Sequence, residues 1–151
     1  MNPKVLIAVS AGITGTITMT MIVLLAPLMG MPKMSPPQML TDMMGVPVIL
    51  GWIMHFMIGI VFAFAYVFLI DKLLAKIFNI FLKGMIFGII AFVFAQVAMA
   101  VISMMVKEPS TSSDNVELII IGSVLGHIMY GIAVVVTAKK MLIRADASLE
   151  G

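Results

Sequence analysis

The sequence has no cysteine among its 151 residues, and only 11% of them are Asp, Glu, Lys or Arg. The lack of cysteine excludes disulfides, thiolate metal sites and covalently attached c-type haem. Apolar residues make up 62% of the chain, and the mean hydropathy is +1.21. A soluble domain of this length needs far more polar surface than this composition supplies. The composition therefore predicts an integral membrane protein.

Long apolar runs account for most of the chain. Four of them, 5–29, 47–70, 83–106 and 117–138, each reach the ~20 residues that a membrane-spanning helix needs. We therefore expect an all-α integral membrane fold with four transmembrane helices. The first run is too long for a signal peptide, and no small-residue cleavage pattern follows it, so we expect it to remain as a helix.

The basic residues are distributed unequally between the two sides of the predicted membrane. Seven of the nine lie on one side, and only Lys33 and Lys107 lie on the other. The positive-inside rule then places both termini and the 71–82 loop in the cytoplasm, and loops 30–46 and 107–116 outside, as expected for a multi-pass protein of the cell (inner) membrane. The seven are Lys4, Lys72, Lys76, Lys83, Lys139, Lys140 and Arg144.

The chain resembles itself at an offset of 72 residues, which aligns its only two histidines, His55 and His127. This predicts two tandem helical hairpins, 1–72 and 73–144, followed by a cytoplasmic tail at 145–151. Parallel repeats of this kind are related by a pseudo-two-fold axis along the membrane normal. Other aligned pairs are Lys4 with Lys76, Gly12 with Gly84, Pro37 with Pro109, Asp42 with Asp114 and Gly59 with Gly131.

Each histidine is flanked by small residues four positions away on either side. The two motifs are Gly51, His55, Gly59 and Ser123, His127, Gly131. Two imidazoles at one depth on parallel helices suit bis-His axial ligation of b-type haem, and the four small residues would leave room for the macrocycle. These six residues form our predicted cofactor site, with the two histidines as metal ligands and electron transfer in a respiratory assembly as the role.

Other roles for the histidines stay open. They could be neutral polar contacts of ~0.6 kcal/mol each in a non-catalytic accessory subunit, whose small residues pack against partner helices or a second copy. They could relay protons, since imidazole titrates near neutrality. Bare zinc or copper is less favoured because no third strong ligand accompanies the pair. The 17 methionines nevertheless leave copper handling as an alternative, although methionine is also an ordinary packing residue.

Acidic residues precede both histidines. Asp42 and Asp114 lie 13 residues before them, ~20 Å along a continuous helix, so the carboxylates are not expected to reach the imidazoles. The prediction is a solvated carboxylate on the outer side, as for Glu108, or the mouth of a small proton or cation transporter.

The loop before the second apolar run carries helix signals. Ser35 suits an N-cap, Pro36 the first helical position and Gly45 the stop. Between them, four apolar residues share one face, which predicts a short interfacial helix on the outer surface. They are Met39, Leu40, Met43 and Met44. The equivalent segment of the second half, EPSTSSDN, is polar and is predicted to be a loop.

The chain has no P-loop, GxSxG, HExxH or Rossmann glycine pattern in the required context, so we expect neither an enzyme nor a nucleic-acid partner. The segments APLMGMPKM, GWIMHFMIG and GHIMYG resemble those of an uncharacterised family of small bacterial and archaeal membrane proteins, a domain of unknown function. The resemblance covers nearly the whole chain. It implies four transmembrane helices and the two histidine motifs, but no activity.

Overall fold

The structure, a computed structural model, describes residues 2–105 and 115–147, and its regular elements are all helical in these ranges. Four helical stretches are long and apolar enough to cross a membrane: Pro3–Met29, Val48–Leu73, Ile80–Met104 and Val116–Ala145. The four predicted spans are therefore confirmed. The fourth extends seven residues beyond its predicted end at 138, because Lys139, Lys140 and Arg144 continue the helix.

Each span is built from one or more helical elements. The first is α1 (Pro3–Leu25) followed by the 3₁₀ turn η1 (Ala26–Met29). The second begins as α3 (Val48–Ala65) and continues through the π-helical turn η2 (Tyr66–Ile70) into α4 (Asp71–Leu73). The third and fourth are single helices, α5 (Ile80–Met105) and α6 (Val116–Ala147).

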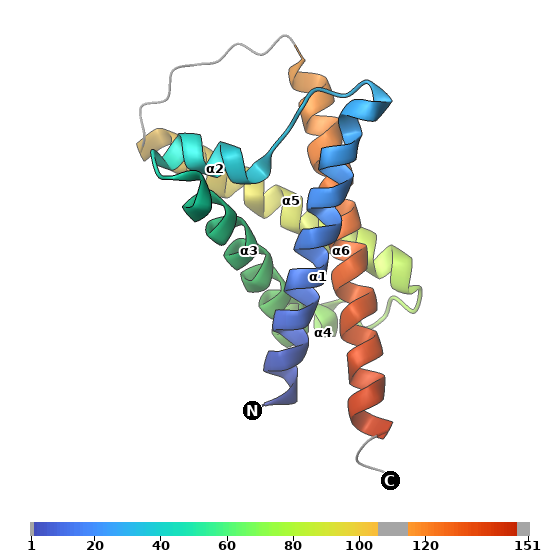
Figure 1. Ribbon diagram of the computed structural model, residues 1–151. Helices are drawn as coiled ribbons and strands as arrows, with labels where there is room; N and C mark the ends of the chain where they lie inside the picture. The colour runs from blue at the N-terminus through green and yellow to red at the C-terminus, as the bar shows by residue number, and fades with distance from the viewer. Residues whose placement is uncertain (1, 106–114, 148–151) are drawn as a thin grey trace.

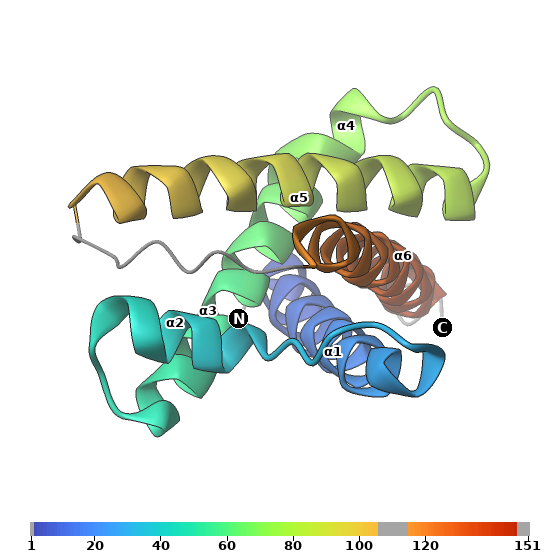
Figure 2. The same ribbon diagram turned by 90° about the horizontal axis from the view of Figure 1, so that it is seen from above.

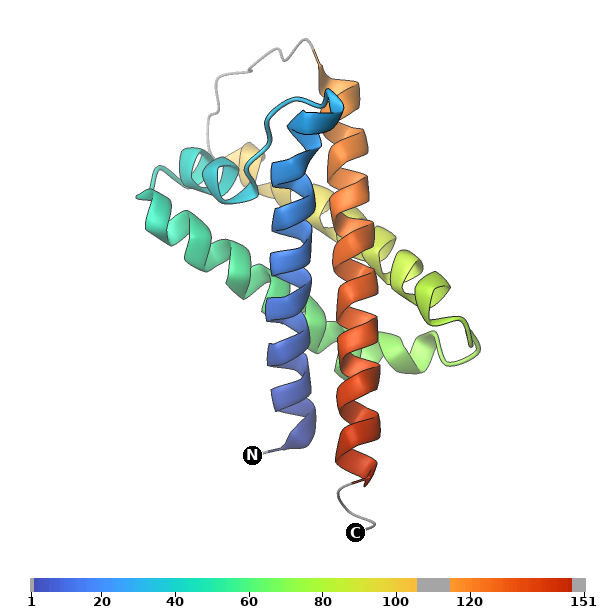
Figure 3. The ribbon, with the colours of Figure 1, turned by 45° about the vertical axis from the view of Figure 1, so that its right-hand side comes forward.

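The helices pack as a central pair with one oblique helix against each member. Helices α1 and α6 run side by side along their length (Figures 1 and 3). Helix α3 packs on α1, and α5 packs on α6. Seen from above, α1 and α6 are viewed nearly end on, whereas α3 and α5 lie across the view (Figure 2). Both termini lie at one end of the molecule, here called the terminal end, and α2 lies toward the other (Figure 1).

Small residues bring the paired helices into close contact. A Cβ on Gly12 of α1 would lie 2.6 Å from the Cα of Ile60 in α3. A Cβ on Gly84 of α5 would likewise lie 2.6 Å from the Cα of Ile132 in α6. No side chain fits at these crossings, so glycine allows the backbones to touch. Gly12 and Gly84, which the 72-residue offset aligns, therefore form equivalent close-packing surfaces.

The helix predicted before the second span is α2 (Pro36–Met44), and its signals act as expected. The Ser35 side chain accepts a hydrogen bond from the Gln38 N–H at 3.4 Å, which caps the helix start. Gly45 ends the helix with φ at 63°, a left-handed conformation that glycine adopts without strain. Helix α2 folds back onto α3, where Met43 is buried.

Candidate functional site

Both histidines line one cavity of about 310 Å³, to which α1, α2, α3, α5 and α6 all contribute. Its lining is mostly apolar, and the polar side chains of Thr16, His55, Gln96, Ser123, His127 and Tyr130 reach it. A mostly apolar pocket with a few convergent polar groups is the usual form of a small-molecule site, and this volume lies near the lower limit for such sites.

His55 projects from α3 and is only 7% exposed. Its Nε2 lies 3.1 Å from the hydroxyl of Thr20 in α1. That hydroxyl also donates to the Thr16 carbonyl at 2.7 Å. Because a hydroxyl has a single proton, Nε2 of His55 acts as the donor to the Thr20 oxygen, and Nδ1 carries the lone pair. Trp52 and Phe56 contact the ring at near-perpendicular angles.

His127 projects from α6 into the same cavity. Its Nδ1 lies 2.8 Å from the backbone carbonyl of Ser123, one turn earlier. A carbonyl can only accept, so Nδ1 donates and Nε2 keeps its lone pair. Proteins commonly hold metal-ligating histidines in this way, with one ring nitrogen donating to a carbonyl and the other free for the metal. Phe92 of α5 meets the ring edge to face, with centroids 5.5 Å apart.

Tyr130 links three helices beside the histidines. Its hydroxyl donates to the Gly59 carbonyl of α3 at 2.5 Å. Its ring lies over Gly15 of α1, where a Cβ would come within 2.8 Å of the ring carbons. The side chain is 4% exposed. Tyr130 thus fixes α6 against α1 and α3 along one side of the cavity.

The small residues of the predicted site lie in two different environments. Gly59 and Ser123 line the cavity with the histidines. Gly51 instead faces α2, where the Pro37 carbonyl and the Thr41 hydroxyl fill the space of a Cβ. Gly131 faces α5, with the backbone of Gly84 and Gly88 against it. At Gly59, the Thr16 hydroxyl of α1 fills the place of a Cβ. Protein therefore occupies the space beside all three glycines.

The acidic residues are not brought to the histidines. Asp42 is an exposed residue of α2 and accepts a hydrogen bond of 2.7 Å from Gln38. Helix α2 contributes Pro36, Met39 and Leu40 to the cavity, but not Asp42. Asp114, Glu108 and Lys107 lie outside the described residues.

Several cavity residues had no signal of their own in the sequence. Thr20 is one of four threonines at alternate positions in α1, and only the fold shows that it meets His55. The 72-residue offset could have located such partners, because it aligns Thr20 with Phe92, the residue that contacts His127.

Among the described residues, no group of three or more His, Cys, Asp or Glu side chains forms a metal cluster. Met19, Met39 and Met99, however, line the cavity with the two imidazoles.

Four long apolar helices with large apolar side chains exposed on their outer faces define a multi-pass helical membrane protein. The chain belongs to a family of unknown function, DUF6789, whose model matches residues 2–147. The resemblance to an uncharacterised membrane family is thereby confirmed. No curated protein and no solved structure matches the chain.

Proposed function

We propose that the protein binds b-type haem in the cavity, with His55 and His127 as axial ligands, and passes electrons within a respiratory assembly. The observation that carries this proposal is that the only two histidines, from α3 and α6, line one mostly apolar cavity. Bis-His haem supplies one-electron chemistry, and apolar surroundings adjust its potential.

The donor set fits the cofactor. Nε2 of His127 has a free lone pair, and the Ser123 carbonyl holds its ring in one tautomer. Nε2 of His55 donates to Thr20, so ligation through Nε2 would break this contact and move the proton to Nδ1. The cavity of about 310 Å³ is small for a macrocycle, and protein fills the place of a Cβ at Gly51, Gly59 and Gly131, so haem binding requires the lining side chains to move apart.

We also infer that the chain is a duplicated hairpin. The packing within each hairpin recurs, with α3 on α1 and α6 on α5, but the α1–α6 contact has no comparable counterpart between α5 and α3 in the described residues, so the expected pseudo-two-fold axis is not supported. Equivalent contacts recur at the 72-residue offset. Ile60 packs on Gly12 as Ile132 packs on Gly84, and Gly59 packs on Thr16 as Gly131 packs on Gly88. The histidines follow the same rule, because His55 meets Thr20 and His127 meets Phe92. Duplication of one helix pair explains all three correspondences.

We place the terminal end in the cytoplasm of the cell membrane. Lys4, Lys72, Lys83 and Lys139 gather around a single cavity at that end. Lys33 is the one described lysine in the segment that leads to α2, toward the other end. The positive-inside rule supports this orientation.

A reduced-minus-oxidised optical spectrum tests the haem proposal. The protein, purified in mild detergent from haem-replete cells, should give a b-type band that is absent from His55→Ala and from His127→Ala. Gln96→Leu changes another polar residue of the cavity lining and should keep the band. A colourless, folded wild-type protein would refute haem binding. Its co-purification within a larger complex would then support an accessory subunit.

Copper(I) is a second candidate because three thioethers share the cavity with the imidazoles. Thioether and imidazole ligands together suit Cu(I), and they require less room than a macrocycle. Competition with a chromogenic Cu(I) chelator measures this binding. Under the copper hypothesis, Met19→Leu and Met99→Leu weaken Cu(I) retention, whereas the exposed Met21→Leu in α1 leaves it unchanged. Under the haem hypothesis, none of the three changes the optical band.

A further inference from the structure

A second cavity, of about 400 Å³, lies at the terminal end and is lined by one lysine from each membrane span. These are Lys4 of α1, Lys72 of α4, Lys83 of α5 and Lys139 of α6. Asp71 is the one acidic residue in the lining. Four positive charges and one negative charge leave the lining with a net charge of +3. The positive-inside rule places lysines on one side of a membrane, but it does not require four spans to direct them to one cavity.

The π-helical turn η2 organises the centre of this cavity. Within η2 and α4, the Asp71 N–H bonds the Tyr66 carbonyl, five residues earlier. In an α-helix, residues five apart are separated by about 1.4 turns and face different directions. The wider π turn brings Tyr66 and Asp71 to the same side. The sequence has no signal for this turn.

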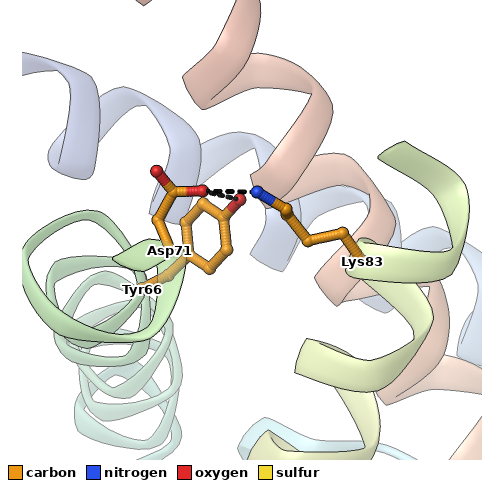
Figure 4. Close-up of polar contacts among 3 residues, drawn as sticks. All are labelled: Tyr66, Asp71 and Lys83. Carbon is orange, nitrogen blue, oxygen red and sulfur yellow. Dashed lines mark hydrogen bonds and ion pairs between the residues drawn. The ribbon is translucent and has the colours of Figure 1, made fainter. Parts of the chain in front are cut away.

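A carboxylate then holds one lysine in place. The Asp71 carboxylate accepts hydrogen bonds from the Tyr66 hydroxyl and from the Lys83 ammonium, both at 3.0 Å (Figure 4). Tyr66 is 3% exposed, and the Lys83 side chain is 16% exposed. Among the side chains that the structure describes, this is the only ion pair. Lys4, Lys72 and Lys139 therefore have no carboxylate partner among the described residues.

The rest of the lining is apolar. Ile77, Ile80 and Leu142 line the same cavity, and Phe78 at its edge is 92% exposed. The cavity thus combines cationic side chains with an apolar rim at the end of a transmembrane bundle. These two parts match the anionic headgroup and the acyl chains of a phospholipid. A soluble phosphate would gain nothing from the apolar part. Basic pockets between transmembrane helices on the cytoplasmic side bind anionic headgroups in this way.

We propose that this cavity is a binding site for the phosphate group of an anionic phospholipid. Lys4, Lys72 and Lys139 supply the positive charge, and the Tyr66–Asp71–Lys83 cluster fixes the floor of the site. Acyl chains extend along the apolar side of the lining into the bilayer. The site is separate from the histidine cavity, and the two lining sets share no residue.

Native mass spectrometry of the full chain in detergent tests this site. Phosphatidylglycerol and phosphatidylcholine are added at equal mole ratios, and the lipid-bound fraction is measured. Phosphatidylglycerol should bind more tightly. Lys139→Gln should weaken its binding about fivefold, the effect of one lysine near an anionic headgroup. Lys140→Gln is the matched control, because it removes the same charge one residue along α6 and does not line the cavity. Equal loss in both variants would overturn the proposal, as would equal binding of the two lipids.

Two further measurements identify the ligand. Lys72→Gln should weaken phosphatidylglycerol binding as Lys139→Gln does, and both variants should keep the wild-type elution volume in size-exclusion chromatography. If one of them fails to fold, the other carries the test. Inorganic phosphate should compete only at concentrations far above those of the lipid. Tight binding of inorganic phosphate without a preference for phosphatidylglycerol would assign the site to a soluble anion and refute the lipid proposal.

Discussion

The hydroxyl of Tyr130 donates a hydrogen bond of 2.5 Å to the backbone carbonyl of Gly59, joining α6 to α3 at the edge of the histidine cavity. The same ring covers Gly15 of α1, so one side chain connects three of the four spans. Tyr130 and His127 are three residues apart, which places them on nearly the same face of α6. The Tyr130 hydrogen bond therefore joins α6 to α3 on the side of α6 that carries His127.

Tyr130→Phe should destabilise the fold without moving the ring. The substitution removes one buried hydrogen bond, and in membrane proteins such a bond contributes ~0.6 kcal/mol on average, with larger values near 1.7 kcal/mol. Because this bond is short and buried, we expect a loss of about 1 kcal/mol in the free energy of unfolding, measured by SDS titration. Thr18→Val removes a hydroxyl that bonds only its own helix, and it should change stability by less. If Tyr130→Phe leaves the free energy of unfolding unchanged, the packing of the ring alone joins the helices.

Gly84→Ala should be among the more disruptive single-methyl changes in the chain. Its Cβ would lie 2.6 Å from the Cα of Ile132, so two backbones must separate. Overpacking of this kind costs about 1–3 kcal/mol, which exceeds the ~1 kcal/mol that alanine gains over glycine in a helix. At Gly122 of α6, a Cβ meets only the flexible ends of the Met34 and Met31 side chains, which can move. The unfolding midpoint should therefore fall for Gly84→Ala and hold or rise for Gly122→Ala.

Part of this architecture follows from sequence alone because it depends on local chemistry. Hydropathy locates the four spans, and Ser35 and Gly45 locate the ends of α2. What a glycine faces depends on which helices cross it. Gly51, Gly59 and Gly131 have the same spacing to a histidine, yet a different helix fills the space beside each: α2, α1 and α5 respectively. A spacing rule gives the face of a helix but not its neighbour.

The π turn and the acceptor of the Tyr130 hydrogen bond could not be predicted from sequence for a related reason. The segment YVFLI is as apolar as the α-helix that precedes it, so its wider turn leaves no mark in the pattern. The bond from Tyr130 to Gly59 joins residues 71 positions apart, and its acceptor is a backbone carbonyl that every residue possesses. Such contacts depend on the three-dimensional packing of the spans.

Thr20→Val should strengthen haem binding, if the cavity is a haem site. In the wild type, Nε2–H of His55 donates to the Thr20 oxygen, so ligation through Nε2 would break this bond and transfer the proton to Nδ1. Removing a bond worth about 1 kcal/mol from the ligand-free state should tighten haem binding about fivefold. Haem titration of the ligand-free protein, followed by absorbance, measures the change, with Thr18→Val as control. Weaker binding in Thr20→Val would mean that Thr20 positions His55 for ligation.

The Asp71 carboxylate at the terminal end has two effects: it stabilises the fold through its ion pair with Lys83, and it lowers the positive charge of the cavity lining. Asp71→Asn should separate them. The ion pair with Lys83 is partly solvated, since the Asp71 side chain is 42% exposed, so its loss should cost at most ~1 kcal/mol of stability. The net charge of the lining rises from +3 to +4, because four lysines then face no carboxylate. Phosphatidylglycerol binding should therefore increase by about twofold to fivefold. Asp42→Asn makes the same charge change on α2, away from this cavity, and should leave lipid binding unchanged. A decrease in Asp71→Asn would show instead that the carboxylate is needed to position Lys83 for the headgroup.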